Sequence, residues 1–166
     1  MRTSPLCVVV LIALAVGCGP AEEAATGPPF MPVADVMHLM QNIVDPAADV
    51  VWGSVGTIID DTGTNEFFPQ NDEEWQLIVN AAMTLTESGN LLMIGERAID
   101  DGLWMEMSQD LVKAGQLALA AAQAQDKDEI FMIGGEVYAA CDQCHATFWV
   151  GDLERGLAFE DAPSQK

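Results

Sequence analysis

Four long stretches in which apolar residues recur every three or four positions constrain the fold of this chain most strongly. The stretches cover residues 32–60, 72–98, 103–125 and 127–149. This spacing places the apolar side chains along one face of a helix, which must then be buried against another element. Helices of this length with mostly short connections pack against one another in alternating directions. The sequence therefore predicts an all-α fold, an antiparallel four-helix bundle with almost no β-strand.

The apolar stripe of the first stretch runs from Val33 to Ile58 and includes Met37 and Met40. Pro46 interrupts this stretch. A proline inside a helix removes a backbone hydrogen bond and crowds the carbonyl group four residues earlier. We therefore expect the helix to be kinked or split at this proline.

The amino-terminal 17 residues have the layout of an export signal. Arg2 precedes an apolar run at residues 6–16, which is too short to span a bilayer as a stable helix. Small residues then precede Cys18, and this junction resembles a bacterial lipobox, with Ala15 where that pattern usually has leucine. Ordinary signal cleavage near Cys18 is the alternative. We predict a signal peptide at residues 1–17, lipidation of Cys18, and export to the periplasm.

Composition divides the rest of the chain into a tether, one domain and a tail. Residues 18–29 are small and rich in proline and glycine, which is typical of a flexible tether. One domain is expected over residues 30–150, and a flexible tail over residues 151–166. Gly19 rather than aspartate follows Cys18. The sorting rule known from some bacteria then favours anchoring in the outer membrane.

The charge of the chain excludes some classes of partner. Six lysines and arginines stand against 26 aspartates and glutamates, which gives a formal net charge of −20 at pH 7. So few cations cannot neutralise the phosphates of a nucleic acid or form a basic patch on anionic lipid headgroups. We expect no nucleic-acid partner and membrane attachment through the lipid at Cys18. The acidity indicates either a partner with a basic surface or a saline exterior.

One motif in the last helical stretch carries chemistry. Residues 141–145 read Cys-Asp-Gln-Cys-His, and Cys-x-x-Cys-His is the attachment motif of c-type haem. On a helix Cys141 and Cys144 share a face, so both thiols can form thioethers to one porphyrin, and His145 can ligate the iron. A zinc site has only His38 as a further soft donor, and a redox dithiol lacks its strand–helix context. A disulfide across three residues would be strained. We predict one haem c per chain.

A helical bundle whose only Cys-x-x-Cys-His motif lies on the last helix resembles the class II c-type cytochromes, the cytochrome c-prime family and its low-spin relatives. The resemblance covers residues 30–149 and rests on the motif, its late position and the number of helices. It implies that Cys141 and Cys144 hold the haem and that His145 is the proximal ligand. It further implies that the first helix covers the opposite face of the haem, and that the chain can pair as a homodimer through its first two helices.

The sixth position on the iron decides what such a protein does. The resemblance places this ligand on the first helix, where Met40 is the first choice and Met37 the second; core packing is the alternative for both. His38 falls on the polar face and is less favoured. A methionine ligand gives a six-coordinate electron carrier. A non-ligating residue leaves an open site for nitric oxide, carbon monoxide or peroxide.

The residues around the motif favour electron transfer. Members of the resembled family often carry a basic residue shortly after the haem histidine, whereas residues 146–150 contain none. No nucleophile pair, phosphate loop or calcium loop stands out elsewhere, so we expect an electron carrier rather than an enzyme. Four nearby residues can wall the haem or serve as ordinary core, namely Val137, Tyr138, Phe148 and Trp149.

Overall fold

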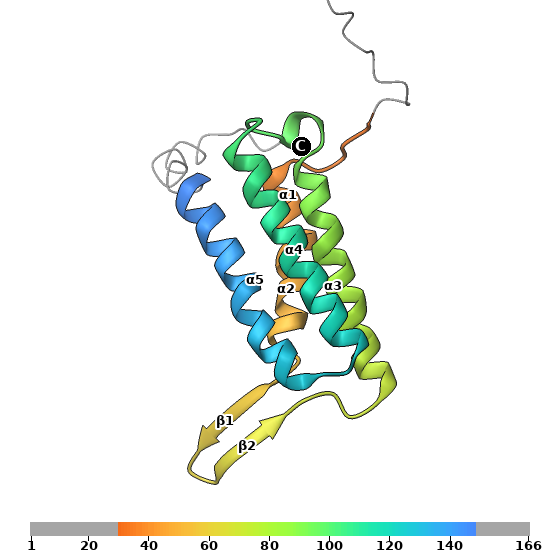
Figure 1. The fold of residues 1–166 in the computed structure, drawn as a ribbon, viewed down its shortest axis with the longest axis vertical. Coiled ribbons are helices and arrows are strands. Elements are labelled where there is room, and N and C mark those ends of the chain that lie inside the picture. The colour runs from red at the N-terminus through yellow and green to blue at the C-terminus, as the bar shows by residue number, and fades with distance from the viewer. Residues whose placement is uncertain (1–29, 149–166) are drawn as a thin grey trace, which may run out of the picture.

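The computed structural model describes residues 30–148, so the predicted signal peptide, Cys18, the tether and the tail lie outside the described residues. Most of the described residues are helical, as predicted (Figure 1). The elements in chain order are α1 (Val36–Leu39), a π-helix (Met40–Val44), α2 (Asp45–Trp52), β1 (Gly56–Asp60), β2 (Gly63–Phe67), α3 (Asp72–Leu92), a 3₁₀ turn (Gly95–Arg97), α4 (Leu103–Gln123) and α5 (Lys127–Phe148).

Capping side chains explain where two of the long helices begin. The side chain of Asn71 accepts a hydrogen bond from the backbone N–H of Glu74 at 2.9 Å, and Glu74 Oε2 accepts one from the N–H of Gln70 at 2.7 Å. The first bond satisfies an N–H group that the first turn of α3 leaves without a helical partner, and the second ties the residue before the cap to the helix. Asp126 caps α5 by accepting a hydrogen bond from the N–H of Glu129 at 3.0 Å.

The long helices pack along their sides. α3 lies against α4 and α4 against α5, while α2 packs against α3 and makes a shorter contact with α5. In Figure 1, α3, α4 and α5 run in alternating directions. The stripe predicted for the second stretch is confirmed as buried, and so is that of the third stretch apart from the half-buried Met107. The apolar core between the helices includes Trp75, Ile78, Leu85, Leu92, Trp104, Leu111, Ile130, Ile133 and Val137.

Two glycines let α3 and α4 approach each other closely. A Cβ atom at Gly115 would lie 2.5 Å from Oγ1 of Thr86 and 2.8 Å from the backbone nitrogen of Thr86. A Cβ atom at Gly89 would lie 2.6 Å from Cγ2 of Val112. Gly89 looks like a weak point of its helix by propensity alone, but the close packing here requires it.

Replacing Gly115 by alanine is expected to lower the free energy of unfolding by about 1–3 kcal/mol, because the added methyl group overpacks the contact with Thr86. Gly135 on α5 is the matched control, since nothing lies within 4 Å of a Cβ atom there. Gly135→Ala is expected to raise the free energy of unfolding by about 0.5–1 kcal/mol through helix propensity. Urea unfolding followed by circular dichroism measures both, and equal shifts would contradict the close approach of α3 and α4.

A β-hairpin occupies part of the region predicted as helix, so the prediction that the first helix continues to residue 60 is wrong, although this small sheet is compatible with the predicted all-α class. β1 and β2 pair antiparallel, with Gly56 opposite Phe67. α2 ends because Gly53 follows it and because residues 57–59 are β-branched, which favours extended backbone. The tight turn uses Gly63 at φ +127°, a conformation that glycine adopts without strain.

The first helical region departs from a regular α-helix just before Pro46. In the π-helix, the N–H of Asp45 donates to the carbonyl group of Met40, five residues earlier instead of four. The expected disturbance at the proline is therefore present, in the form of this wider turn. The wider turn changes which residues face the core. Leu39 is buried, whereas Met37 is 56% exposed.

Three members of the apolar stripe predicted for this region lie on the surface. Val33 is fully exposed ahead of α1, Met37 is exposed on α1, and Ile58 is exposed in β1. The prediction that these residues belong to one buried helical face is wrong, because the region contains a π-helix and a hairpin instead of one continuous α-helix.

Candidate functional site

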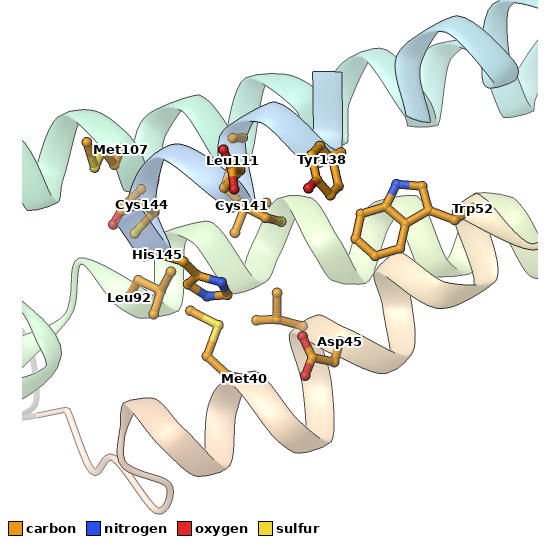
Figure 2. A pocket seen from close by; sticks show the side chains of 14 residues that line it. Met40, Asp45, Trp52, Leu92, Met107, Leu111, Tyr138, Cys141, Cys144 and His145 are labelled. Carbon is orange, nitrogen blue, oxygen red and sulfur yellow. The ribbon is translucent and has the colours of Figure 1, made fainter. Parts of the chain in front are cut away.

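A cavity of about 250 Å³ lies between the first helical region and the carboxyl-terminal half of α5, and Figure 2 shows the side chains around it. Most of these side chains are apolar. They come from the π-helix and α2 to α5, and they are Met40, Val44, Asp45, Trp52, Leu92, Met107, Ser108, Leu111, Tyr138, Ala140, Cys141, Asp142, Cys144 and His145.

The predicted motif forms one wall of this cavity. Cys141, Cys144 and His145 lie near the end of α5, and all three are half-buried. Residues three and four positions apart on a helix are neighbours on its surface, so the three side chains reach the cavity from one face of α5. The structure thus brings together all three residues of the motif.

Met40 reaches the same cavity from the opposite side. Figure 2 shows its side chain extending from the first helical region toward the imidazole of His145. Met37 does not line the cavity and is 56% exposed. The side chain of His38 is also exposed, and its Nδ1 lies 2.8 Å from Oδ1 of Asp35. Of the three residues considered for the sixth position, only Met40 lies at the motif.

Burial controls the acidity of the two thiols. Desolvation raises the pKa of Cys141 to about 11, with smaller contributions from the nearby Asp45 carboxylate and from Cys144. Burial also raises the pKa of Cys144. Both thiols are therefore protonated near neutral pH in the haem-free chain.

Cys141 in the haem-free chain is expected to react slowly with iodoacetamide. At pH 8 a thiol with a pKa of about 11 is about one thousandth thiolate, against about a quarter for an ordinary cysteine, and only the thiolate reacts. The rate should therefore be about 200-fold below that of the urea-unfolded chain and should rise with pH up to about pH 11. Mass spectrometry of the alkylated peptide measures this rate.

The matched pair for the thiol measurement is Asp45→Asn and Asp49→Asn. Asp45 lines the cavity, and its carboxylate helps to raise the pKa of Cys141. Asp49 is exposed on the same helix outside the cavity. Only Asp45→Asn should speed the alkylation of Cys141. Equal rates in the folded and unfolded wild-type chains would contradict the burial of this thiol.

The charged residues that line the cavity are acidic. Asp45 and Asp142 both line it and are largely exposed, and none of the described residues around it is lysine or arginine. The rim of the cavity therefore carries negative charge.

An aromatic pair lines one end of the cavity and joins two helices. Trp52 Nε1 donates a hydrogen bond to the carbonyl group of Gly134 at 2.9 Å, which links the end of α2 to α5. The ring of Trp52 lies 6.4 Å from that of Tyr138, measured between centroids. Both aromatic side chains line the cavity. The bond holds the short α2–α5 contact together next to the motif.

The four residues expected to wall the site have different positions. Tyr138 lines the cavity, whereas Val137 is fully buried in the core. Phe148 packs edge-on against Trp104, with ring centroids 5.0 Å apart. Trp149 lies outside the described residues.

Several lining residues were not identified from the sequence as part of a site. Met107 and Leu111 belong to the apolar stripe of α4, but the stripe does not say which of its members border a cavity. Asp45, Trp52 and Leu92 carry no such signal in the sequence, because their place at the cavity depends on how α2 and the end of α3 pack.

No protein-family model matches this chain, and no curated protein or solved structure is significantly similar to it. Within residues 30–148, no group of three or more His, Cys, Asp or Glu side chains is arranged to hold a metal ion. The helices of that same part include none with the length and hydropathy needed to cross a membrane. A function for this chain must be inferred from the cavity and its lining residues.

Proposed function

We propose that this chain is an exported c-type haem protein that carries electrons, with the haem linked to Cys141 and Cys144 and ligated by His145 and Met40. One observation carries the proposal, namely the convergence of two thiols, an imidazole and a thioether on a single cavity. The thioether belongs to a helical region far from the motif in sequence. Its position opposite the motif is independent of the Cys-x-x-Cys-His pattern.

The donor set and the cavity wall suit a haem c. Each thiol would add across one vinyl group, with the sulfur bonding to one vinyl carbon and its proton passing to the other. This addition needs no oxidant and has no leaving group. Apolar side chains, including Val44, Leu92 and Leu111, would shield the macrocycle from water.

A haem bound here would supply one-electron exchange. His145 and Met40 would both ligate the iron, and a thioether ligand raises the reduction potential. With both residues bound to it, the iron would offer no open site to a substrate. We therefore propose electron transfer rather than an enzymatic activity.

Location and partner follow from the rest of the chain. We propose an antiparallel four-helix bundle formed by the α1–α2 region and α3 to α5, tethered by a lipid at Cys18 to the outer membrane on its periplasmic side. The exposed carboxylates of Asp45 and Asp142 at the cavity support docking of a redox partner with a basic surface.

The test combines a denaturing gel with optical spectra of the exported chain. We expect a haem-linked band at the mass of the chain and sharp low-spin bands that carbon monoxide does not change. High-spin bands with a large shift on adding carbon monoxide would indicate that the chain binds a small gas instead of carrying electrons. A gel with no haem-linked band would overturn the proposal altogether.

A further inference from the structure

The π-helix shifts the register of the first helical region by one residue. Leu39 and Val44 are five residues apart, yet their side chains are only 1% and 3% exposed. In a regular α-helix, residues five apart would be turned about 140° from each other, so both could not face the core. The π-helix between them, with Asp45 bonded back to Met40, brings both to the same side. Met40 then follows the buried Leu39 and borders the cavity.

The sequence also fits a second register in which this region is one straight α-helix. Met37, Met40, Val44, Ala48 and Val51 follow one another at steps of three or four across the proline. In that register Met40 would take the core position that Leu39 holds in the structure. The next residue, Gln41, would then face the cavity.

Pro46 discriminates between these two registers. It is the second residue of α2 and has no N–H to donate to the carbonyl group of Asn42, four residues earlier. In a straight α-helix its ring would also crowd that carbonyl group. A wider turn immediately before the proline relieves the crowding by its ring, and the π-helix ends at Val44, just before α2 begins.

We propose that Pro46 is the positioning residue for Met40. By excluding the straight helix it holds Met40 out of the core and directs it to the cavity, where Figure 2 shows its side chain extending toward His145. The consequence for iron ligation rests on the haem function proposed above. The placement of Met40 itself does not depend on haem.

The decisive variants are Pro46→Ala and the same substitution combined with deletion of Gln41, an exposed residue of the π-helix. Pro46→Ala alone permits the straight helix, so we expect the low-spin spectrum to be lost and carbon monoxide to bind. The deletion removes the extra residue of the wide turn. An α-helix in the double variant then holds both Leu39 and Met40 where they lie in the structure, and we expect the low-spin spectrum to return.

A second readout uses the haem-free full chain and tests the placement directly. Nuclear Overhauser contacts between the Met40 methyl group and the His145 ring are expected in the wild-type chain. They should be lost in Pro46→Ala and regained in the double variant. If the wild-type chain carries no haem, the proposed function fails, and these contacts still decide the role of the proline.

Two outcomes would overturn the role of Pro46. One is a Pro46→Ala chain that keeps both the low-spin spectrum and the Met40–His145 contacts. The other is a double variant that fails to restore what Pro46→Ala lost, whether the loss is of ligation or of folding. A merely structural role for the proline would not be repaired by shortening the helix by one residue.

Discussion

Haem attachment is expected to be lost completely when Cys141 and Cys144 are both replaced by alanine. Each thioether is a covalent link, so either single substitution should leave one link and a weaker haem-stained band on a denaturing gel. The double variant should show no band above background, because no bond then survives denaturation. Blotting of the same gel checks that the chain is still made and exported.

The two histidines of the chain supply a matched control for this first prediction. His145 lines the cavity, whereas His38 is exposed and paired with Asp35. His145→Ala should change the optical spectrum through loss of the proximal ligand. His38→Ala should leave both the spectrum and the stained band unchanged. If the two substitutions have the same effect, the assignment of the iron ligand is wrong.

Met40→Ala is expected to convert a low-spin haem to a high-spin haem that binds carbon monoxide. Removing the thioether ligand should also lower the reduction potential, since methionine ligation favours the reduced iron. A tenfold change in that preference corresponds to about 60 mV for one electron, and we expect at least this much. Spectra with and without carbon monoxide and a redox titration measure these effects.

Met37→Ala is the matched control for Met40→Ala, because the side chain of Met37 is 56% exposed and lies outside the cavity. It should change neither the spectrum nor the potential. Met40→Leu separates ligation from packing, since leucine has nearly the same volume but no sulfur. A low-spin spectrum that survives Met40→Leu would show that Met40 packs against the site without ligating the iron.

The long helices could be predicted because their local signals and their packing agree. The sequence of α3 has a typical capping pair, Asn71 and Glu74, and the structure shows the hydrogen bond between them. Its apolar stripe includes Trp75 and Leu85, and both side chains are buried. The end of α3 was predicted six residues too late. The chain turns beyond Leu92, where Gly95 adopts φ +59° and begins a 3₁₀ turn.

The hairpin could not be predicted from capping residues and apolar spacing. Val55 is buried and continues the helical spacing of α2, so the stripe gives no sign that the helix has ended. Contacts with a distant part of the chain support the extended form. Lys127 on α5 lies 3.6 Å from a carboxylate oxygen of Glu66 in β2 and 5.6 Å from the ring centroid of Phe68.

The sequence by itself determined the parts of this protein that depend on near neighbours. The spacing of Cys141, Cys144 and His145 places them on one face wherever the helix packs, and the apolar stripes of α3 and α4 specify their buried faces. Only the tertiary structure decided what lies opposite the motif. Met37 and Met40 lie on the same predicted apolar stripe, with Met40 the first choice as ligand, and a one-residue shift of register before Pro46 separates them in the structure. Pro46 biases that register locally, but only the packing of this helical region against α5 brings Met40 and His145 to the same cavity.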